Sequence, residues 1–217
     1  MGRTKMSEEQ FMENRKSILN AALNILVEKG IDDVSARKVA TALNMTATNI
    51  YNYYENKDEL LFAMQNYGFE MLYNLLEESH QPSQTPLENI RNFINTYLSF
   101  AIDHSKIYAL MFGDYFQKYH QFASKSNHFK SYFIDYTTNK LKFPETTFNT
   151  IDQAKKNNPR IANDDTNKLI LKLFSAAHGF IVLYNNGVLS SIVPNEIEFL
   201  KENVDYLIKP FEHYESA

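Results

Sequence analysis

The segment that decides the fold is ILNAALNILVEKGIDDVSARKVATALNMTATNIYNYYENKDELL, residues 18–61. It begins with apolar residues at helical spacing, and Gly30 stands where a C-terminal helix cap belongs. Ser35 and Thr46 are N-cap candidates, each followed by a short helical pattern. Between them Asn44 tolerates the left-handed backbone conformation that a tight turn requires. The segment therefore predicts a long helix, a short helix, a tight turn and a second short helix.

The two short helices differ in the side chains that they present. The first has a small apolar face, whereas its other side is basic and carries Arg37 and Lys38. The second has a polar flank of Thr48, Asn49 and Asn52 opposite an apolar one. This order of helices within about 40 residues is the helix-turn-helix arrangement, whose last helix enters the DNA major groove. We therefore expect a DNA-binding head.

The same segment resembles the TetR family of transcriptional regulators in the order, spacing and caps of its helices. The resemblance implies that the last short helix recognises the operator and that its tyrosines contact phosphates. It implies an inward-facing, core position for Tyr54. For Arg37 and Lys38, a solvated role explains the sequence about as well as a DNA contact. The residues expected at the DNA are Arg37, Lys38, Thr46, Ala47, Thr48, Asn49, Tyr51, Asn52, Tyr53 and Lys57.

After residue 56 the pattern changes to longer helices. Asn56 and Glu59 resemble a capping box, and the apolar spacing that follows predicts a helix over 57–78 with Gly68 as its weak point. No segment alternates like a strand for long, so we expect an all-α fold: a three-helix head, residues 1–56, joined by this long helix to a larger body, residues 57–217. Further helices are predicted over 86–103, 105–113, 116–141, 145–156 and 169–184, and from Pro194 to Pro210.

The helix predicted over 169–184 is apolar on nearly every face and is therefore expected to be wrapped by neighbours, in part from a second chain. The family resemblance implies that the last two helices form a dimer and that the body holds a small-molecule pocket. The residues expected at the dimer interface are Phe174, Ile181, Ile197, Leu200, Val204 and Leu207.

Aromatic side chains with polar tips suit apolar ligands that make a few hydrogen bonds. The body offers several such residues as pocket candidates, although packing of the bundle explains any single one of them more simply. The candidates are Tyr97, Phe100, Tyr108, Phe112, Tyr115, Phe116, Phe133 and His178.

Composition narrows the classes of function. An apolar fraction of 44% excludes a disordered chain, and the absence of cysteine removes disulfides and thiol chemistry and suits the cytoplasm. No apolar run reaches the roughly 20 residues that span a bilayer. Apart from the weak pair Glu77 and His80, no metal-ligand spacing, phosphate loop or nucleophile elbow occurs. We therefore expect no enzyme, cofactor, metal or membrane partner.

Together these features predict a cytoplasmic, homodimeric repressor. It would bind a double-stranded, pseudo-palindromic operator and leave it when a small, largely apolar or aromatic ligand binds. The alternative is a helical ligand carrier or enzyme whose helix-turn-helix has lost DNA binding. The eight basic and nine acidic residues within residues 1–60 favour this alternative, whereas Tyr51, Tyr53 and Lys57 favour the repressor.

Overall fold

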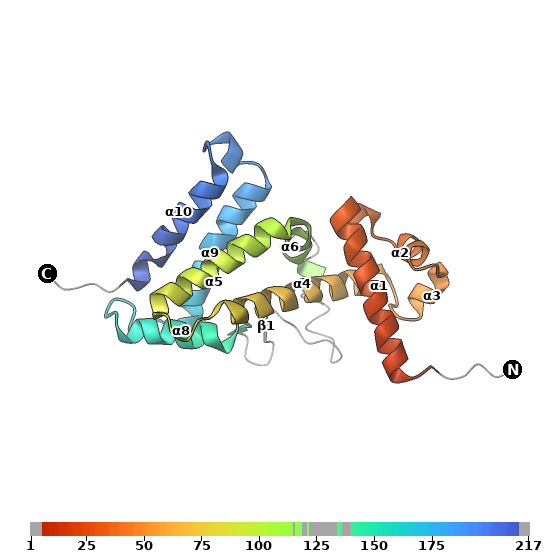
Figure 1. The fold of residues 1–217 in the computed structure, drawn as a ribbon, viewed down its shortest axis with the longest axis horizontal. Helices are drawn as coiled ribbons and strands as arrows, with labels where there is room; N and C mark the ends of the chain where they lie inside the picture. Colours follow the sequence, from red (N-terminus) through yellow and green to blue (C-terminus); the bar gives the residue numbers. More distant parts are fainter. Residues whose placement is uncertain (1–5, 115, 119–120, 122–133, 136–139, 213–217) are drawn as a thin grey trace. The chain divides into compact units, whose positions relative to one another are not determined.

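The computed structural model describes residues 6–114, 116–118, 121, 134–135 and 140–212. These residues belong to two compact units. The first, which we call the head, draws on residues 1–68 and 106–130, and the second, the body, on residues 69–105 and 131–217. The predicted all-α class is confirmed, since nearly all of the described elements are helices (Figure 1). The functional division at residue 56 stays a prediction.

The head begins with helix α1 (Glu8–Lys29), which is capped at both ends, at Gly30 as predicted. The Ser7 hydroxyl accepts a hydrogen bond from the Gln10 N–H at 3.2 Å. At the other end Gly30 has a φ of 92°, and its N–H donates to the Leu26 carbonyl at 2.9 Å. A left-handed backbone at this position favours glycine, because a Cβ would be strained there. The buried side of α1 supplies Ile18, Ala22 and Leu26 to the core of the head.

Helices α2 (Ala36–Ala42) and α3 (Ala47–Tyr51) follow after a single 3-10 turn, Ile31–Asp33. Their predicted caps are confirmed, because the Ser35 and Thr46 hydroxyls each accept from a backbone N–H three residues later at 3.3 Å. Figure 1 shows the two short helices beside α1.

The turn between α2 and α3 depends on Asn44, which has a φ of 54°. Asparagine adopts this left-handed conformation more readily than most residues with a side chain. The Met45 N–H then closes the turn by donating to the Ala40 carbonyl at 2.8 Å. Val39 and Ile50, one from each helix, are buried, and they fix the two helices against each other and the rest of the head.

Helix α4 (Lys57–Ser79) begins where predicted and runs through both units, the last of its residues in the head being Gly68. Gly68 is not a weak point but a site of close packing against helix α6 (Ser105–Phe112). A Cβ placed on Gly68 would lie 2.7 Å from the Met111 Sδ and 2.8 Å from the Ile107 Cγ2. Only glycine lets the two helices approach this closely.

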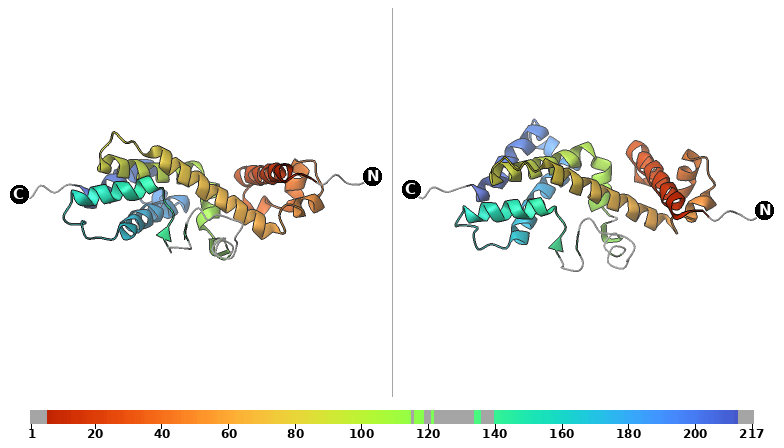
Figure 2. Two further views of the ribbon diagram at one scale, coloured as in Figure 1. Left: turned by 90° about the horizontal axis from the view of Figure 1, so that it is seen from below. Right: turned by 60° about the horizontal axis from the view of Figure 1, so that its bottom comes forward.

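The body contains the second part of α4 with α5 (Pro86–Asp103), α8 (Glu145–Lys156), α9 (Thr166–Asn185) and α10 (Glu196–Ile208). Helix α5 is central, since it packs against α8, α9 and α10 (Figures 1 and 2). Short 3-10 turns follow α9 and α10, at Leu189–Ser191 and Lys209–Phe211.

The helix predicted over 116–141 is wrong in its last part. Ile134–Asp135 and Lys140–Leu141 form a short antiparallel ladder, in which Ile134 pairs with Leu141. The sequence between these strands includes two threonines and an asparagine, Thr137, Thr138 and Asn139, which are poor helix formers. The 3.6-residue apolar pattern alone did not reveal this change.

None of the helices in the described parts of the chain is long and apolar enough to cross a membrane.

A buried asparagine ties the end of the body to the α8–α9 connection. Asn158 is 1% exposed, and its side-chain amide donates to the carbonyls of Pro210 at 3.0 Å and Glu212 at 2.9 Å. Its carbonyl oxygen accepts from the Arg160 N–H at 3.0 Å. All three hydrogen bonds join the Asn158 side chain to backbone groups, and the two that it donates reach residues more than 50 positions away.

We expect Asn158→Ala to lower the free energy of unfolding by about 2–3 kcal/mol, because it removes the three hydrogen bonds made by a buried side chain. Urea denaturation followed by circular dichroism measures the loss. Asn163→Ala, at an exposed position in the same connection, is the control and should change stability by less than about 0.5 kcal/mol. Equal stability of the two variants would contradict the anchoring role.

Candidate nucleic-acid interface and body cavity

Helix α3 exposes a polar face that contains one large aromatic ring. Thr48 and Asn52 are exposed, and the Asn52 amide donates to the Asn49 side-chain oxygen at 3.2 Å. Tyr51 is 51% exposed, whereas its neighbour Ile50 is 1% exposed and belongs to the core. The helix therefore divides into a packed side and an accessible side that offers amides, hydroxyls and a phenol.

The other predicted contacts lie at helix starts. Thr46 is exposed, but its hydroxyl already caps α3. Lys57 is exposed in the first turn of α4, where backbone N–H groups favour an anion. Lys38 forms an ion pair with Asp33, which offsets part of its charge, and Arg37 is exposed beside it. Contact of these residues with DNA stays a prediction.

Tyr53 has a different environment from Tyr51. It is 7% exposed, and its ring lies 5.1 Å from that of Phe11, centroid to centroid. Its hydroxyl accepts a hydrogen bond from the Asn14 amide at 2.9 Å. A phosphate contact from Tyr53 would have to replace or extend this bond. Tyr51 is therefore the better placed of the two tyrosines for a phosphate.

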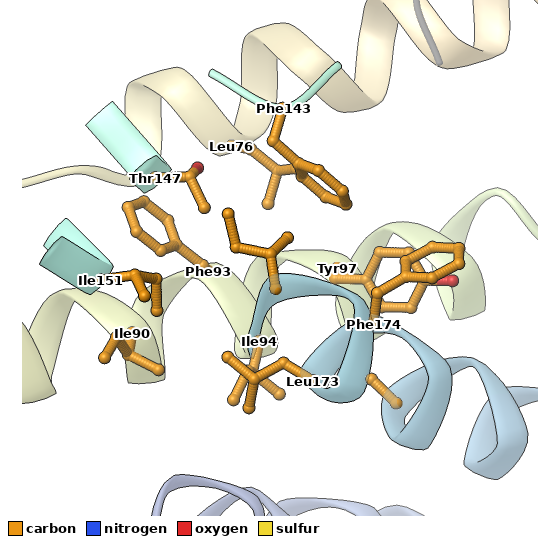
Figure 3. A pocket seen from close by; sticks show the side chains of 12 residues that line it. Leu76, Ile90, Phe93, Ile94, Tyr97, Phe143, Thr147, Ile151, Leu173 and Phe174 are labelled. Atoms are coloured by element: carbon orange, nitrogen blue, oxygen red, sulfur yellow. The ribbon is translucent and has the colours of Figure 1, made fainter. Parts of the chain in front are cut away.

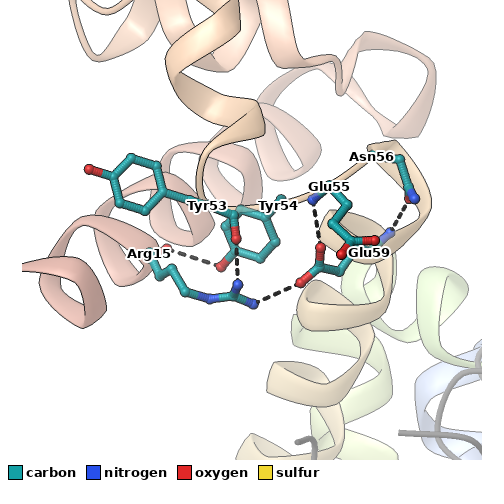
Figure 4. Close-up of polar contacts among 6 residues, drawn as sticks. All are labelled: Arg15, Tyr53, Tyr54, Glu55, Asn56 and Glu59. Carbon is teal, nitrogen blue, oxygen red and sulfur yellow. Dashed lines mark hydrogen bonds and ion pairs between the residues drawn. The ribbon is translucent and has the colours of Figure 1, made fainter. Parts of the chain in front are cut away.

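A single arginine joins α1 to the connection between α3 and α4 (Figure 4). The Arg15 guanidinium donates to the Tyr53 carbonyl and to the Glu59 carboxylate, the latter at 3.1 Å. It also lies 4.2 Å above the ring centroid of Tyr54, a cation–π distance. In return the Tyr54 hydroxyl donates to the Arg15 carbonyl at 3.1 Å. We call these four residues the Arg15 clamp.

The clamp confirms the prediction that Tyr54 is a core residue, since it is 3% exposed. Burial raises the pKa of the Tyr54 hydroxyl above its ordinary value, although the Arg15 charge opposes this rise. Glu59 also accepts from the Glu55 N–H at 2.6 Å, while its own N–H donates to the Asn56 side chain at 2.9 Å. The clamp thus fixes both the end of α3 and the start of α4. Sequence reasoning missed Arg15, because a single basic residue on a helix belongs to no motif.

The body contains an apolar cavity of about 50 Å³ between α4, α5, α8 and α9 (Figure 3). For comparison, one water molecule needs about 10–15 Å³. The residues around it include Ile90, Phe93, Ile94, Tyr97, Leu173 and Phe174.

The structure separates the predicted pocket residues. Tyr97 lines the cavity, and its hydroxyl lies 3.2 Å from the Nδ1 of His178. His178 itself does not line the cavity but contacts a residue that does. Phe100 is buried elsewhere in the body core. Tyr108, Phe112 and Phe116 belong to the head unit and do not line this cavity. The predictions for Tyr115 and Phe133 lie outside the described residues.

Most of the residues predicted at the dimer interface are buried within the single chain, and their place in an interface stays a prediction. Ile181, Leu200, Val204 and Leu207 are 0–9% exposed. Phe174 lines the cavity instead, and Ile197 lies in a groove between α5 and α10.

Other apolar side chains of the same region are exposed. Helix α9 is apolar on all sides, so its sequence period could not tell the outward face from the inward one. The exposed residues are Leu171, Val182, Leu183, Val188, Ile192 and Tyr206.

Within the described part of the chain, no group of three His, Cys, Asp or Glu side chains is placed to hold a metal ion. The described residues form two surfaces and a cavity: a polar helix face in the head, an exposed apolar face on α9, and apolar walls inside the body.

Comparison with known proteins agrees with this arrangement. Residues 18–64 match the family described as bacterial regulatory proteins, tetR family. A 60-residue segment is 32% identical to an HTH-type transcriptional repressor of Mycobacterium tuberculosis and covers 28% of this chain and 32% of that protein. A 51-residue segment is 41% identical to the class D tetracycline repressor protein of Escherichia coli, covering 24% and 23% of the two chains. The chain thus spans only a third or less of these relatives' length.

The whole fold has solved counterparts as well. A TetR variant from Acinetobacter baumannii, solved in complex with minocycline, superposes with a TM-score of 0.55 at 14% identity. The match covers 95% of this chain and 97% of that one. At this identity the likeness establishes the fold of the body but not its ligand.

We expect Arg15→Met to lower the free energy of unfolding of the head by about 2–3 kcal/mol. The substitution removes the hydrogen bonds that the guanidinium donates to the part-buried Glu59 carboxylate and to the Tyr53 carbonyl. Thermal unfolding followed by circular dichroism measures this loss. Lys16→Met, at the exposed neighbouring position, is the control. Arg15→Lys should recover only part of the stability, since an ammonium cannot donate to both groups in the same plane. Wild-type stability of Arg15→Met would show that the clamp contributes nothing.

Proposed function

We propose that this chain, a member of the TetR family of bacterial regulatory proteins by its residues 18–64, is a homodimeric repressor that a small molecule releases from its operator. Membership of the family makes it a DNA-binding transcriptional regulator. The dimer, the release by a ligand, repression as the sign of control and location in the cytoplasm are parts of the proposal. The observation that carries it is the exposed polar face of α3, held in place by the Arg15 clamp.

The face of α3 has the chemistry that a major-groove helix needs. Amide and hydroxyl groups of Thr48, Asn49 and Asn52 can exchange hydrogen bonds with base edges. Tyr51 and Lys57 flank this face and suit phosphate oxygens, the lysine with support from the N-terminus of α4. Phosphate contacts would fix the register, and the amides would read the sequence.

Dimerisation would explain the exposed apolar face of α9. Leu171, Ser175, Gly179 and Val182 follow one another at spacings of three and four, and all four are exposed. A Cβ on Gly179 would meet nothing within 4 Å in the single chain. Small residues between larger apolar ones allow a second helix to approach closely, and a twofold dimer would cover this face with its own copy. Two heads related by a twofold axis would then read a pseudo-palindromic site.

Release requires that a change in the body reaches the head. Helix α4 continues through both units, and α6 follows α5 after the single residue His104. Within the head, α6 is held firmly: the Lys106 ammonium donates to the Val27 carbonyl at 2.6 Å, and the Gln65 amide donates to the Leu110 carbonyl at 2.8 Å. The contact at Gly68 adds close packing. A ligand that displaces α5 would therefore pull α6, and with it the head.

The competing function is a helical ligand carrier or enzyme with a head that no longer binds DNA, and the slightly acidic charge of residues 1–60 favours it. Selection of duplexes from a random pool at low salt separates the two functions. A repressor enriches one related set of sites, and footprinting then identifies the operator. If no duplex is enriched, the repressor proposal fails.

On the selected operator, we expect Tyr51→Ala and Lys57→Ala each to weaken binding by about tenfold, which corresponds to about 1.4 kcal/mol. Lys57→Ala should also reduce the slope of log affinity against log salt by about one, because one phosphate contact is lost. Fluorescence anisotropy over a salt series measures both effects. Tyr67→Ala and Lys29→Ala, at exposed positions outside the α3 face, are the matched controls. Equal affinities for all four variants would place the DNA elsewhere.

We expect Val182→Glu and Gly179→Lys each to convert a dimer to a monomer, since both put a charge at the centre of the exposed α9 face. Sedimentation velocity gives the oligomeric state, and circular dichroism confirms that the variants are folded. Lys156→Glu, at an exposed position on α8, controls for the change of charge. A wild-type monomer, or variants that remain dimeric, would contradict a dimer built on α9.

A further inference from the structure

The walls of the body cavity contain no charged side chain and only two polar ones among the described residues. These two are Tyr97 and Thr147, and the other lining residues are aliphatic or phenylalanine. Apolar walls of this kind favour apolar atoms over water. It would also reject a charge, because burying a carboxylate or an ammonium without a partner is very costly.

The polar end of Tyr97 is engaged within the protein. Its hydroxyl and the Nδ1 of His178 lie 3.2 Å apart, and the Phe174 ring is stacked on the imidazole at a centroid distance of 5.7 Å. Burial lowers the pKa of His178, so the imidazole is neutral near pH 7. The pair therefore adds no charge to the cavity and leaves the ring of Tyr97 as its wall.

Thr147 differs from Tyr97 because its hydroxyl has no partner. The residue is 6% exposed, and among the described residues its Oγ1 is buried without any hydrogen bond. Figure 3 shows the methyl group of Thr147, not its hydroxyl, turned toward the other lining side chains. In a helix threonine divides between two χ1 rotamers. A rotation about χ1 would bring the hydroxyl into the position of the methyl group and into the cavity.

We propose that the ligand of this regulator is an uncharged, predominantly hydrocarbon molecule with a single hydrogen-bonding group, which pairs with the Thr147 hydroxyl. This inference rests on the proposed function, since it names the chemical class of the releasing molecule. A hydroxyl or carbonyl group on the ligand satisfies the buried Thr147 oxygen, and the hydrocarbon part replaces empty space between Phe93, Ile94 and Leu173. The small volume selects a short molecule or one end of a longer one.

Matched probes of equal chain length test the charge requirement. Full-length protein is titrated by calorimetry at pH 7.5 with hexanol, hexanoate and hexylammonium, and with butanol and octanol to cover shorter and longer chains. We expect saturable binding of at least one alcohol and binding of each charged partner of equal length that is weaker by about 100-fold or more. Preference for hexanoate or hexylammonium, or no binding of any alcohol, overturns the proposal.

Thr147→Val tests the hydrogen bond, because valine keeps the shape and removes the hydroxyl. We expect the affinity for the best alcohol to fall by about threefold to tenfold, while that for 1-chlorohexane, which lacks a donor, stays the same or rises. Thr146→Val is the matched control: its hydroxyl bonds to the Glu77 carboxylate at 2.9 Å and does not line the cavity. An unchanged alcohol affinity in Thr147→Val removes Thr147 from the site.

Ala177→Leu fills the cavity and should abolish binding of every probe. Alcohol binding that survives in folded Ala177→Leu locates the ligand elsewhere and overturns the proposal. If this variant does not fold, the comparison of Thr147→Val with Thr146→Val still tests whether the ligand binds at Thr147.

Release of the selected operator is measured with the same probes, so that the two proposals fail separately. Alcohols that bind through Thr147 without reducing operator affinity would support the ligand class and contradict the proposal that the ligand releases the protein from its operator. Release by hexanoate or hexylammonium alone would support the release and sink the ligand class.

Discussion

The head depends on one part-buried charge, the guanidinium of Arg15. A five-residue helix such as α3 cannot hold its own geometry, because helix nucleation is unfavourable and most of its N–H and C=O groups lie at its ends. Its position comes from neighbours: Ile50 packs into the core, and Arg15 ties the residues just after α3 to α1. Because the same guanidinium also binds Glu59, the end of α3 and the start of α4 share one anchor. The polar face of α3 can remain accessible because Ile50, on the other side of the helix, makes the buried contact.

The body follows a different rule, since apolar packing around α5 dominates it. Eight residues of α5 are buried, and they meet three other helices. Polar groups inside the body are few and serve as fixed points, as Asn158 does for the end of the chain. Thr147 and Asn167 differ from Asn158, because the Thr147 hydroxyl and the Asn167 side-chain oxygen are buried without a hydrogen bond among the described residues. Of these two residues, Thr147 lines the apolar cavity, where a ligand could supply the missing partner.

Local signals predicted the helices well. The helix predicted over 86–103 is α5, and its capping box, formed by Thr85 and Glu88, makes both of its hydrogen bonds. Ser35 and Thr46 likewise cap their helices as predicted. These signals succeed because a cap acts over three or four residues and needs no distant partner. The prediction over 116–141 failed where pairing between Ile134 and Leu141 outweighed an apolar helical period.

The sequence by itself determined the all-α class, the ends of most helices and the helix-turn-helix order, because caps, turns and apolar period are local properties of the chain. Tertiary structure alone decided which faces are covered. It buried Tyr53 while leaving Tyr51 exposed, and it turned Ile181 inward and Val182 outward on a helix that is apolar all round. It also brought Arg15 to Tyr54 and Glu59, some 40 residues away. Burial and long-range pairing depend on neighbours that a periodic pattern cannot identify, and for that reason the candidate surfaces emerged only from the fold.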